Sequence, residues 1–350
     1  MSKKILATFS TDWHIKEDNT EQIIDLVTQQ CELNKKSGCK IMVCLGDVFN
    51  SRKSQTLLVL NTFGKILDII DSYGLILYCI PGNHDKTSYE SNESFLDQFQ
   101  YHPALSLIKL LGGIPFRDTN VFLHFIPFFS NDLWVEKFKE LLDHQEIIPH
   151  IDNKTKHILC SHIAVQGSQN NDGTKVESSI KPSMFKDFHK VFLGHYHNQQ
   201  QIGSNIFHLP SIQQNNFGED EEKGFTVLYE DGSHELVKSK FKPYKKVKID
   251  VDKLSKSELN EVINEYTKEA QNSYVRFILE GREETLKSID KDKFLQVGID
   301  VKTKSNEIGI IEDFDTVEIS QYTDENIVEE FEQFCEEKGL DFKQGIKYLK

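Results

Sequence analysis

The sequence predicts an α/β fold, and two observations support this prediction. Short apolar runs rich in β-branched residues alternate with helix-like stretches along residues 4–85, which is typical of βαβ units and a largely parallel sheet. Sharply polar clusters follow the carboxyl ends of the apolar runs. In open α/β sheets, this edge is where ligand sites form.

Each expected element rests on its own pattern. Apolar residues at helical spacing predict helices at residues 21–36 and 57–73. The run at residues 224–241 turns at Asp231-Gly232 and predicts a β-hairpin. The remaining strands are expected at residues 4–10, 40–49, 75–85, 120–129, 157–165 and 190–197.

The character of the sequence changes near residue 246. Two or three short strands around a helix at 255–270 predict a small α+β domain. Residues 323–338 form a very acidic helical pattern, which is either a solvated face or a docking segment, and residues 342–350 predict a short final helix. The expected parts of the chain are residues 1–245, 246–320 and 321–350.

Composition and charge restrict the class of protein. The net charge of −14 argues against nonspecific binding to nucleic acid, although bound divalent cations can invert the sign of a site for a phosphate substrate. Six cysteines without a CxxC pair indicate free thiols in a reducing compartment. The N-terminus reads as a first strand, and no run approaches the roughly 18 apolar residues of a membrane helix. We therefore expect a cytoplasmic protein without a membrane segment.

Polar residues gather after five of the expected strands. Each cluster alone has an ordinary explanation, since Gly-Asp and Gly-Asn-His-Asp are common in turns and a His after an apolar run is usually a loop residue. Together the clusters supply the oxygen and imidazole ligands that hydrolysis of a phosphate ester by two metals requires. The candidates are Asp12 and His14 in DWH, Asp47 and Asn50 in GDVFN, Asn83, His84 and Asp85 in GNHD, His162 in SHIAVQG, and His195 and His197 in GHYH.

The order Asp-x-His, Gly-Asp, Gly-Asn-His-Asp, His and Gly-His-x-His resembles the calcineurin-like metallophosphoesterase superfamily across about residues 5–240. The resemblance implies a four-layer β-sandwich flanked by helices, with a small C-terminal α+β capping domain. It also implies that Asp47 bridges two metal ions, that His84 is a general acid or transition-state stabiliser, and that Asp85 orients His84. The implied ligands are Asp12, His14, Asp47 and His197 for one ion, and Asp47, Asn83, His162 and His195 for the other.

The segment HLPSIQQNNFGEDEEKGFTVLY, residues 208–229, narrows the resemblance. It is similar to the segment that follows Gly-His-x-His in the SbcD family of DNA double-strand-break nucleases, with Phe-Gly-Glu at 217–219 and Lys-Gly-Phe at 223–225. The stretch HIAVQGS at 162–168 also resembles that family. The Gly-Asp-x-x-Asp-Arg-Gly pattern of serine/threonine phosphatases is absent, and the length is similar to that of the recombination endonuclease subunit of tailed phages.

The chain departs from this family in two places. Archaeal and eukaryotic members have a His three residues after the bridging Asp, where this chain has Asn50. Any contribution of that His to exonuclease action is therefore not carried over. The region after residue 245 matches the family's capping domain and partner-binding segment only in placement, so no residue roles are carried over there.

The SbcD resemblance implies a nuclease with two divalent metal ions, manganese or alternatively magnesium. The implied activities are 3′-to-5′ exonuclease action on duplex DNA and endonuclease action on single strands. The implied partners are DNA, a second copy of the chain and an SbcC-like coiled-coil ATPase, in the host cytoplasm if a phage encodes the protein. Candidate DNA contacts in loops near the site, with ordinary surface residues as the alternative, are Lys16, Asn50, Arg52 and Lys53.

Two rival functions stay open at this point. The chain could be a small-molecule phosphodiesterase or phosphatase of the same superfamily, although residues 208–229 and the appended domain argue against this. It could also be a non-catalytic scaffold that keeps the fold. The presence of all seven implied ligands together with His84 argues against a scaffold.

Overall fold

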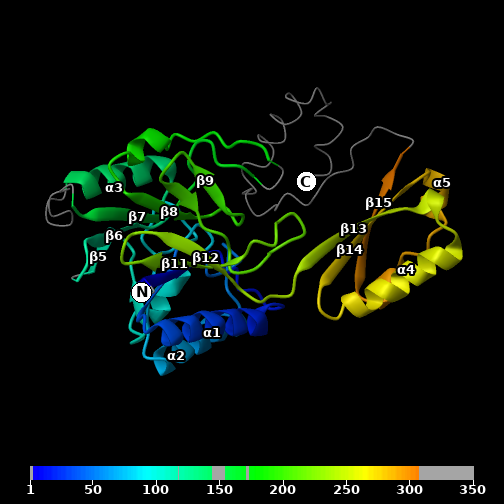
Figure 1. Cartoon of the computed structure of the whole chain (residues 1–350), viewed down its shortest axis with the longest axis horizontal. Helices are drawn as coiled ribbons and strands as arrows, with labels where there is room; N and C mark the ends of the chain where they lie inside the picture. The colour runs from blue at the N-terminus through cyan, green and yellow to red at the C-terminus, as the bar shows by residue number, and fades with distance from the viewer. Residues whose placement is uncertain (1–2, 117, 144–153, 171–172, 307–350) are drawn as a thin grey trace. The chain divides into compact units, whose positions relative to one another are not determined.

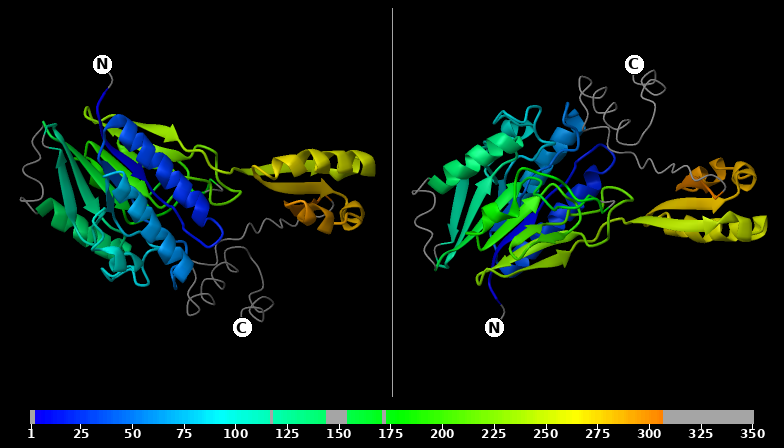
Figure 2. Two further views of the ribbon diagram at one scale, coloured as in Figure 1. Left: turned by 90° about the horizontal axis from the view of Figure 1, so that it is seen from below. Right: turned by 90° about the horizontal axis from the view of Figure 1, so that it is seen from above.

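The computed structural model describes residues 3–116, 118–143, 154–170 and 173–306. Its strands form two six-stranded sheets and one three-stranded sheet. Figures 1 and 2 show how the elements are arranged. All five polar strand ends belong to the two larger sheets, so these sheets position the candidate site.

The first sheet has a parallel centre and an antiparallel edge. Strands β1 to β4 pair in parallel, whereas β11 pairs antiparallel with β1, and β12 pairs antiparallel with β11. The last two form the hairpin predicted at Asp231-Gly232, where Gly232 has a φ of 76°. In spatial order, the strands are β12 (His234–Lys238), β11 (Gly224–Tyr229), β1 (Ile5–Ser10), β2 (Ile41–Cys44), β3 (Ile76–Cys79) and β4 (Leu105–Leu107).

The second sheet is built in the same way. Strands β6, β7, β8 and β10 pair in parallel, and β5 and β9 close the two edges in antiparallel orientation. In spatial order, the strands are β5 (Gly112–Phe116), β6 (Val121–Ile126), β7 (Lys156–His162), β8 (Lys190–Gly194), β10 (Ile206–His208) and β9 (Gln200–Ile202).

Helices cover the outer faces of both large sheets (Figure 1). Helices α1 (Thr20–Ser37) and α2 (Leu57–Ser72) pack against the first sheet, and α3 (Asn131–Asp143) packs against the second. The end of α1 is set by Gly38, which has a left-handed φ of 74°. The layers are therefore helix, sheet, sheet and helix.

Side chains of the central strands alternate between the inner core and the helix-covered faces. Met42 and Cys44 of β2 pack beneath the helices, whereas Val43 faces the second sheet. In β8, Phe192 lies between the sheets, and its neighbours Val191 and Leu193 pack on the side of α3. This is the two-residue period of a strand. Burial on both faces explains why the strands read as continuous apolar runs.

A three-stranded parallel sheet with its own apolar core follows in the sequence. Its central crossover helix begins with a capping box between Ser255 and Glu258. The elements are β13 (Tyr244–Asp250), α4 (Lys256–Glu269), β14 (Tyr274–Gly281), α5 (Glu283–Lys287), α6 (Asp292–Gln296) and β15 (Ile299–Ser305). A short 3₁₀ helix, Val251–Lys253, lies between β13 and α4, and two others in the preceding part of the chain span Phe95–Phe99 and Pro182–Phe185.

The predicted fold class is confirmed, because two helix-flanked sheets form the sandwich and a small α+β unit follows. Helix α3 and the short strands β4, β5, β9 and β10 were not anticipated. The acidic helix expected at 323–338 and the final helix at 342–350 lie outside the described residues. Within the described ranges, no helix has the length and apolarity to cross a bilayer, and the five described cysteines are free thiols.

Candidate metal centre

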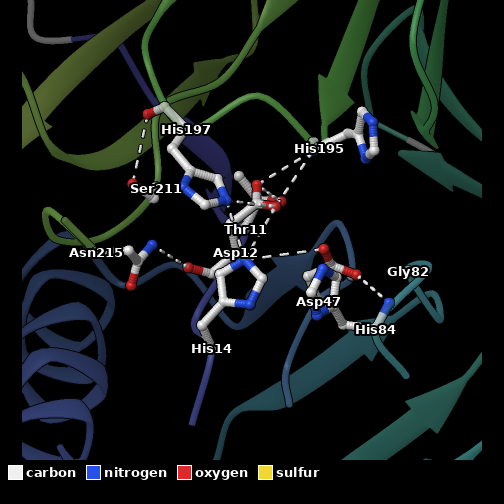
Figure 3. Close-up of polar contacts among 12 residues, drawn as sticks. Thr11, Asp12, His14, Asp47, Gly82, His84, His195, His197, Ser211 and Asn215 are labelled. Carbon is white, nitrogen blue, oxygen red and sulfur yellow. Dashed lines mark hydrogen bonds and ion pairs between the residues drawn. The ribbon is translucent and has the colours of Figure 1, made fainter. Parts of the chain in front are cut away.

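The five polar strand ends meet at the carboxyl edges of the two large sheets. Figure 3 shows Asp12, Asp47, His84 and His195 among the residues that converge there. Backbone hydrogen bonds link the first two loops, since the amide of Asp12 donates to the carbonyl of Gly46 at 3.0 Å and that of His14 to the carbonyl of Asp47 at 3.1 Å. In the described ranges, the non-glycine residues with positive φ are all candidate ligands: Asp12 (53°), His14 (46°), Asp47 (53°) and His195 (87°). Strained backbone of this kind concentrates at functional sites.

Glycines allow these strand ends to approach closely. A Cβ at Gly46 would lie 2.6 Å from the backbone nitrogen of Gly82, and a Cβ at Gly194 would lie 2.7 Å from His162 Nδ1. A Cβ at Gly82 would overlap the carboxylate of Asp47. The glycines of the Gly-Asp, Gly-Asn-His-Asp and Gly-His motifs are therefore required by close packing.

Asp12, His14 and His197 form the first group of donors. The Nε2 atoms of His14 and His197 are 3.0 Å apart, and they lie 3.9 and 3.8 Å from Asp12 Oδ1. The hydroxyl of Thr11 donates to the Asp12 carboxylate at 2.7 Å, and the backbone amide of His195 does so at 3.2 Å. The carboxylate is thus fixed while it faces both imidazoles, as Figure 3 shows.

Asn83, His162 and His195 converge in the second group. The side-chain oxygen of Asn83 lies 3.0 Å from both His162 Nε2 and His195 Nδ1. The far nitrogen of the His162 ring, Nδ1, donates to the carbonyl of Leu45 at 2.6 Å, which leaves Nε2 free to face the group. These residues come from the ends of β3, β7 and β8.

Asp47 lies between the two groups. Its Oδ2 is 3.8 Å from His14 Nε2 in the first group and 3.3 Å from His162 Nε2 in the second. Its Oδ1 accepts a hydrogen bond of 2.8 Å from the backbone amide of His84. This is the placement that a bridging carboxylate requires.

His84 sits at the edge of this arrangement, almost fully buried. Its Nδ1 donates to the backbone carbonyl of Asn50 at 2.6 Å, which turns Nε2 toward Arg52. The carboxylate of Asp85 instead accepts the backbone amides of Phe49 at 3.0 Å and Gly82 at 2.8 Å. The group that orients His84 in the structure is therefore the Asn50 carbonyl, and Asp85 braces the surrounding loops.

Burial and neighbouring charges shift the pKa values of the site histidines, two downward and two upward. Burial lowers the pKa of both His14 and His195 well below the usual value, so both rings are neutral at pH 7 and can bind a cation. Burial also opposes protonation of His162 and His197, but adjacent carboxylates outweigh it and raise the pKa of each to about 9. A cation would replace these protons, so metal binding and proton release are coupled.

The donor set fits two divalent cations. Two imidazole nitrogens face each other at 3.0 Å, and two more face one amide oxygen at 3.0 Å, with buried carboxylates beside both pairs. Such groups are unfavourable together without a positive charge between them, and carboxylate, amide and imidazole are ligands of ions such as manganese and zinc.

Of the predicted DNA contacts, only Arg52 places its side chain beside the candidate site. Arg52 Nη2 lies 3.5 Å from His84 Nε2, and its guanidinium contacts the hydroxyl of Tyr89. Asn50 reaches the site through its backbone. Lys16 pairs with Asp18 at 3.5 Å, and Lys53 is exposed in the loop that follows β2.

Two residues that contact the candidate ligands, Thr11 and Glu219, have no role in the sequence-based prediction of the site. Thr11 holds Asp12, and the buried Glu219 accepts a 2.7 Å hydrogen bond from His197 Nδ1. The resemblance at 208–229 marks Glu219, but the sequence does not reveal its contact with His197, which lies 22 residues away.

Three comparisons show which known proteins this chain is similar to. The model of the family described as calcineurin-like phosphoesterase matches residues 6–199. A protein of Invertebrate iridescent virus 6 named "Putative phosphoesterase 244L" is 27% identical over 311 residues, which cover 81% of this chain and 97% of that protein. The crystal structure of a dimetal phosphatase from Danio rerio has a TM-score of 0.42 and 10% identity, and the match covers 65% of this chain and 93% of that one. Because the family model spans more than half of the chain, the protein belongs to the calcineurin-like phosphoesterase family.

Proposed function

We propose that this phosphoesterase is a two-metal DNA nuclease, with 3′-to-5′ exonuclease action on duplex DNA and endonuclease action on single strands. The observation that carries hydrolysis is the convergence of seven candidate ligands and His84 at one edge of the sandwich. The choice of DNA is supported by residues 208–229, which resemble the SbcD nucleases.

Each residue of the centre has a role in this proposal. Bound divalent ions, manganese in the first instance and magnesium as the alternative, would activate a water and neutralise the charge that develops on the phosphate. One ion would be held by Asp12, His14, Asp47 and His197, and the other by Asp47, Asn83, His162 and His195. His84 would stabilise the transition state and donate a proton to the leaving sugar oxygen from Nε2, since Nδ1 is held by the backbone.

Arg52 supports a phosphodiester substrate, because its fixed charge lies beside His84 where a second phosphate or the scissile group would pass. The ring of Tyr89 lies beneath this guanidinium, 5.5 Å from its carbon, and meets Phe128 with ring centroids 4.9 Å apart. All three side chains are half-buried, so they offer a charged and aromatic border next to the centre. Bases stack on such aromatic surfaces.

The test is a cleavage assay with linear duplex DNA, single-stranded DNA and bis(p-nitrophenyl) phosphate, each with and without manganese. We expect metal-dependent cleavage of both DNA substrates. Cleavage of the small ester with no cleavage of either DNA would refute the nuclease proposal.

The second candidate is a phosphoesterase that acts on small molecules. The relative that matches across 97% of its own length is named only as a phosphoesterase, which leaves the substrate class open. The same assay, extended to nucleotide and sugar phosphomonoesters, separates the two candidates.

We further propose that the protein works as a homodimer with an SbcC-like coiled-coil ATPase. The proposed division of labour places catalysis in residues 1–245, a DNA-facing cap in 246–320 and ATPase docking in 321–350. Support comes only from the resemblance in motif order and in the placement of these segments. Light scattering of the pure protein, and duplex digestion with and without the ATPase, would test these proposals; a monomer with no response to the ATPase would refute them.

A further inference from the structure

The segment from Phe217 to Phe225 carries two buried charges to which two-metal chemistry assigns no role. The side chain of Lys223 is fully buried, and Glu219 is 6% exposed. Lysine and glutamate are almost never buried to this extent unless they are paired. Burying an ion pair is costly, and replacing it by apolar residues is often neutral or stabilising. Its presence beside a candidate ligand therefore calls for a functional explanation.

The carboxylate of Glu219 is saturated with donors and directed at His197. Oε1 accepts hydrogen bonds from His197 Nδ1 at 2.7 Å and from the side chain of Asn216 at 2.9 Å. Oε2 accepts the backbone amide of Asn215 at 3.1 Å and lies 3.3 Å from Lys223 Nζ. The position of this carboxylate is thus fixed on all sides.

Lys223 holds the same histidine by its backbone. Its Nζ donates to the carbonyl of His197 at 2.6 Å and to the side-chain oxygen of Asn198 at 2.8 Å. The backbone amide of Ser211 donates to that carbonyl at 3.0 Å and the Ser211 hydroxyl at 3.4 Å, and Figure 3 shows Ser211 beside this carbonyl. Glu219 therefore fixes the ring of His197, and Lys223 fixes its main chain.

This arrangement decides which ring nitrogen faces the centre. Because Nδ1 donates to a carboxylate, Nε2 is the ring nitrogen left to bind a cation, and it lies 3.8 Å from Asp12 Oδ1 and 3.0 Å from His14 Nε2. A carboxylate on the far nitrogen also makes an imidazole a more basic ligand. Among the histidines of the described site, His197 is the one with such a partner, whereas His162 has the neutral carbonyl of Leu45.

We propose that Glu219, neutralised by Lys223, is a positioning residue that holds the ring of His197 with Nε2 toward the centre and thereby controls metal affinity at one of the two ion sites. The affected site is that of Asp12, His14 and His197; the site of Asn83 and His162 does not depend on Glu219. This inference rests on the proposed two-metal function.

The first experiment is a calorimetric titration of the full-length, metal-free chain with manganese alone. In the parent, we expect two ions to bind. Glu219→Gln keeps the shape but removes the charge, and it should weaken one site by about 10- to 100-fold and leave the other unchanged. The matched control is Glu222→Gln, three residues away, where the side chain is 55% exposed and pairs with the exposed Lys238. This control should bind both ions like the parent.

A second readout is the tautomer of His197 in the metal-free protein, observed by ¹⁵N NMR of the ring at a pH above its raised pKa of about 9, where the ring is neutral. We expect a proton on Nδ1 in the parent and in Glu222→Gln. Glu219→Gln should shift the population toward a proton on Nε2. An unchanged His197 spectrum in Glu219→Gln would overturn the proposal.

The double variant Glu219→Gln/Lys223→Met separates positioning from mere structural support. Lys223→Met alone leaves a buried carboxylate without its cation and should strongly lower the free energy of unfolding, whereas removing both charges should restore most of it. The proposal requires that the restored double variant still binds one ion weakly. Full manganese affinity in the double variant would overturn it. If the expected pattern appears but the parent does not cleave DNA, the nuclease proposal fails and this inference stands.

Discussion

Gly82 offers a test of how tightly the carboxylate of Asp47, the proposed bridge between the two ions, is packed. In Gly82→Ala the new Cβ would lie 2.9 Å from the carboxyl carbon of Asp47, and closer still to its Oδ1. Ordinary carbon–carbon contacts are about 3.5 to 4.0 Å, so Asp47 and the loop of Gly82 must separate by roughly 1 Å. Asp47 Oδ2 would then lose its position between His14 and His162.

A misplacement of about 1 Å at a catalytic group can cost roughly 100-fold in rate, equivalent to about 2.7 kcal/mol in the activation free energy. We therefore expect kcat/KM for a phosphodiester with manganese to fall by about that factor in Gly82→Ala. The assay is the initial rate of bis(p-nitrophenyl) phosphate hydrolysis across a manganese titration. Thermal unfolding of the same sample reports whether the fold is kept.

The matched control is Gly64→Ala. Gly64 lies within α2, and a Cβ there would come no closer than 3.7 Å to Phe99. Alanine is favoured over glycine in a helix by about 1 kcal/mol, so this variant should be fully active and slightly more stable. A folded Gly82→Ala protein with the parent's rate would refute the reasoning. If Gly82→Ala does not fold, Gly194→Ala provides a parallel test at His162, because its Cβ would lie 2.7 Å from His162 Nδ1.

Three further predictions concern other residues. His84→Ala should lower kcat by about 10²- to 10⁴-fold with manganese affinity unchanged, because Asp47 binds the backbone amide of His84; parental cleavage would contradict the role of its ring. Arg52→Ala should raise KM for DNA by about 10-fold with little change in kcat, and an unchanged KM would exclude Arg52 from substrate binding. Burial and the neighbouring His157 lower the pKa of His124 to about 3. Between about pH 6.5 and pH 3, His124 is therefore protonated in the unfolded chain but not in the folded one, so the free energy of unfolding decreases as the pH is lowered through that range. Between pH 7 and pH 5 the free energy of unfolding should fall by about 2 kcal/mol from this source, and His124→Phe, measured by urea unfolding, should lack that decrease. The same dependence of unfolding free energy on pH in the variant and the parent would contradict the prediction.

The sequence was most informative where local pattern and burial agree. Residues 41–44 and 190–194 read as strands because both of their faces are buried, and each ends at a Gly-Asp or Gly-His motif. By contrast, β9 and β10 have three residues each, which is too short for a period to be read. Strand β10 pairs with β8, and β9 pairs with β10, through contacts that a local pattern does not reveal.

The contacts of the side chains around the candidate ligands could not be predicted from the sequence. Asp85 follows His84 directly, yet its carboxylate binds the amides of Phe49 and Gly82, because the turn directs it away from the ring. Glu219 was visible only as a part of a family-like segment. Its contact with His197 depends on how the loop after β10 folds back over the strand ends.

The sequence by itself determined the succession of strands and helices and the chemical types of the candidate ligands, because hydrophobic period and strand-end motifs are local properties of the chain. The tertiary structure decided that β1 to β3 and β7 to β8 belong to different sheets whose carboxyl edges meet, which brings Asp47 within 3.8 Å of His14 and 3.3 Å of His162. It also decided that a buried carboxylate and lysine hold His197. These distances depend on packing between segments far apart in the chain, and packing is set by the whole core.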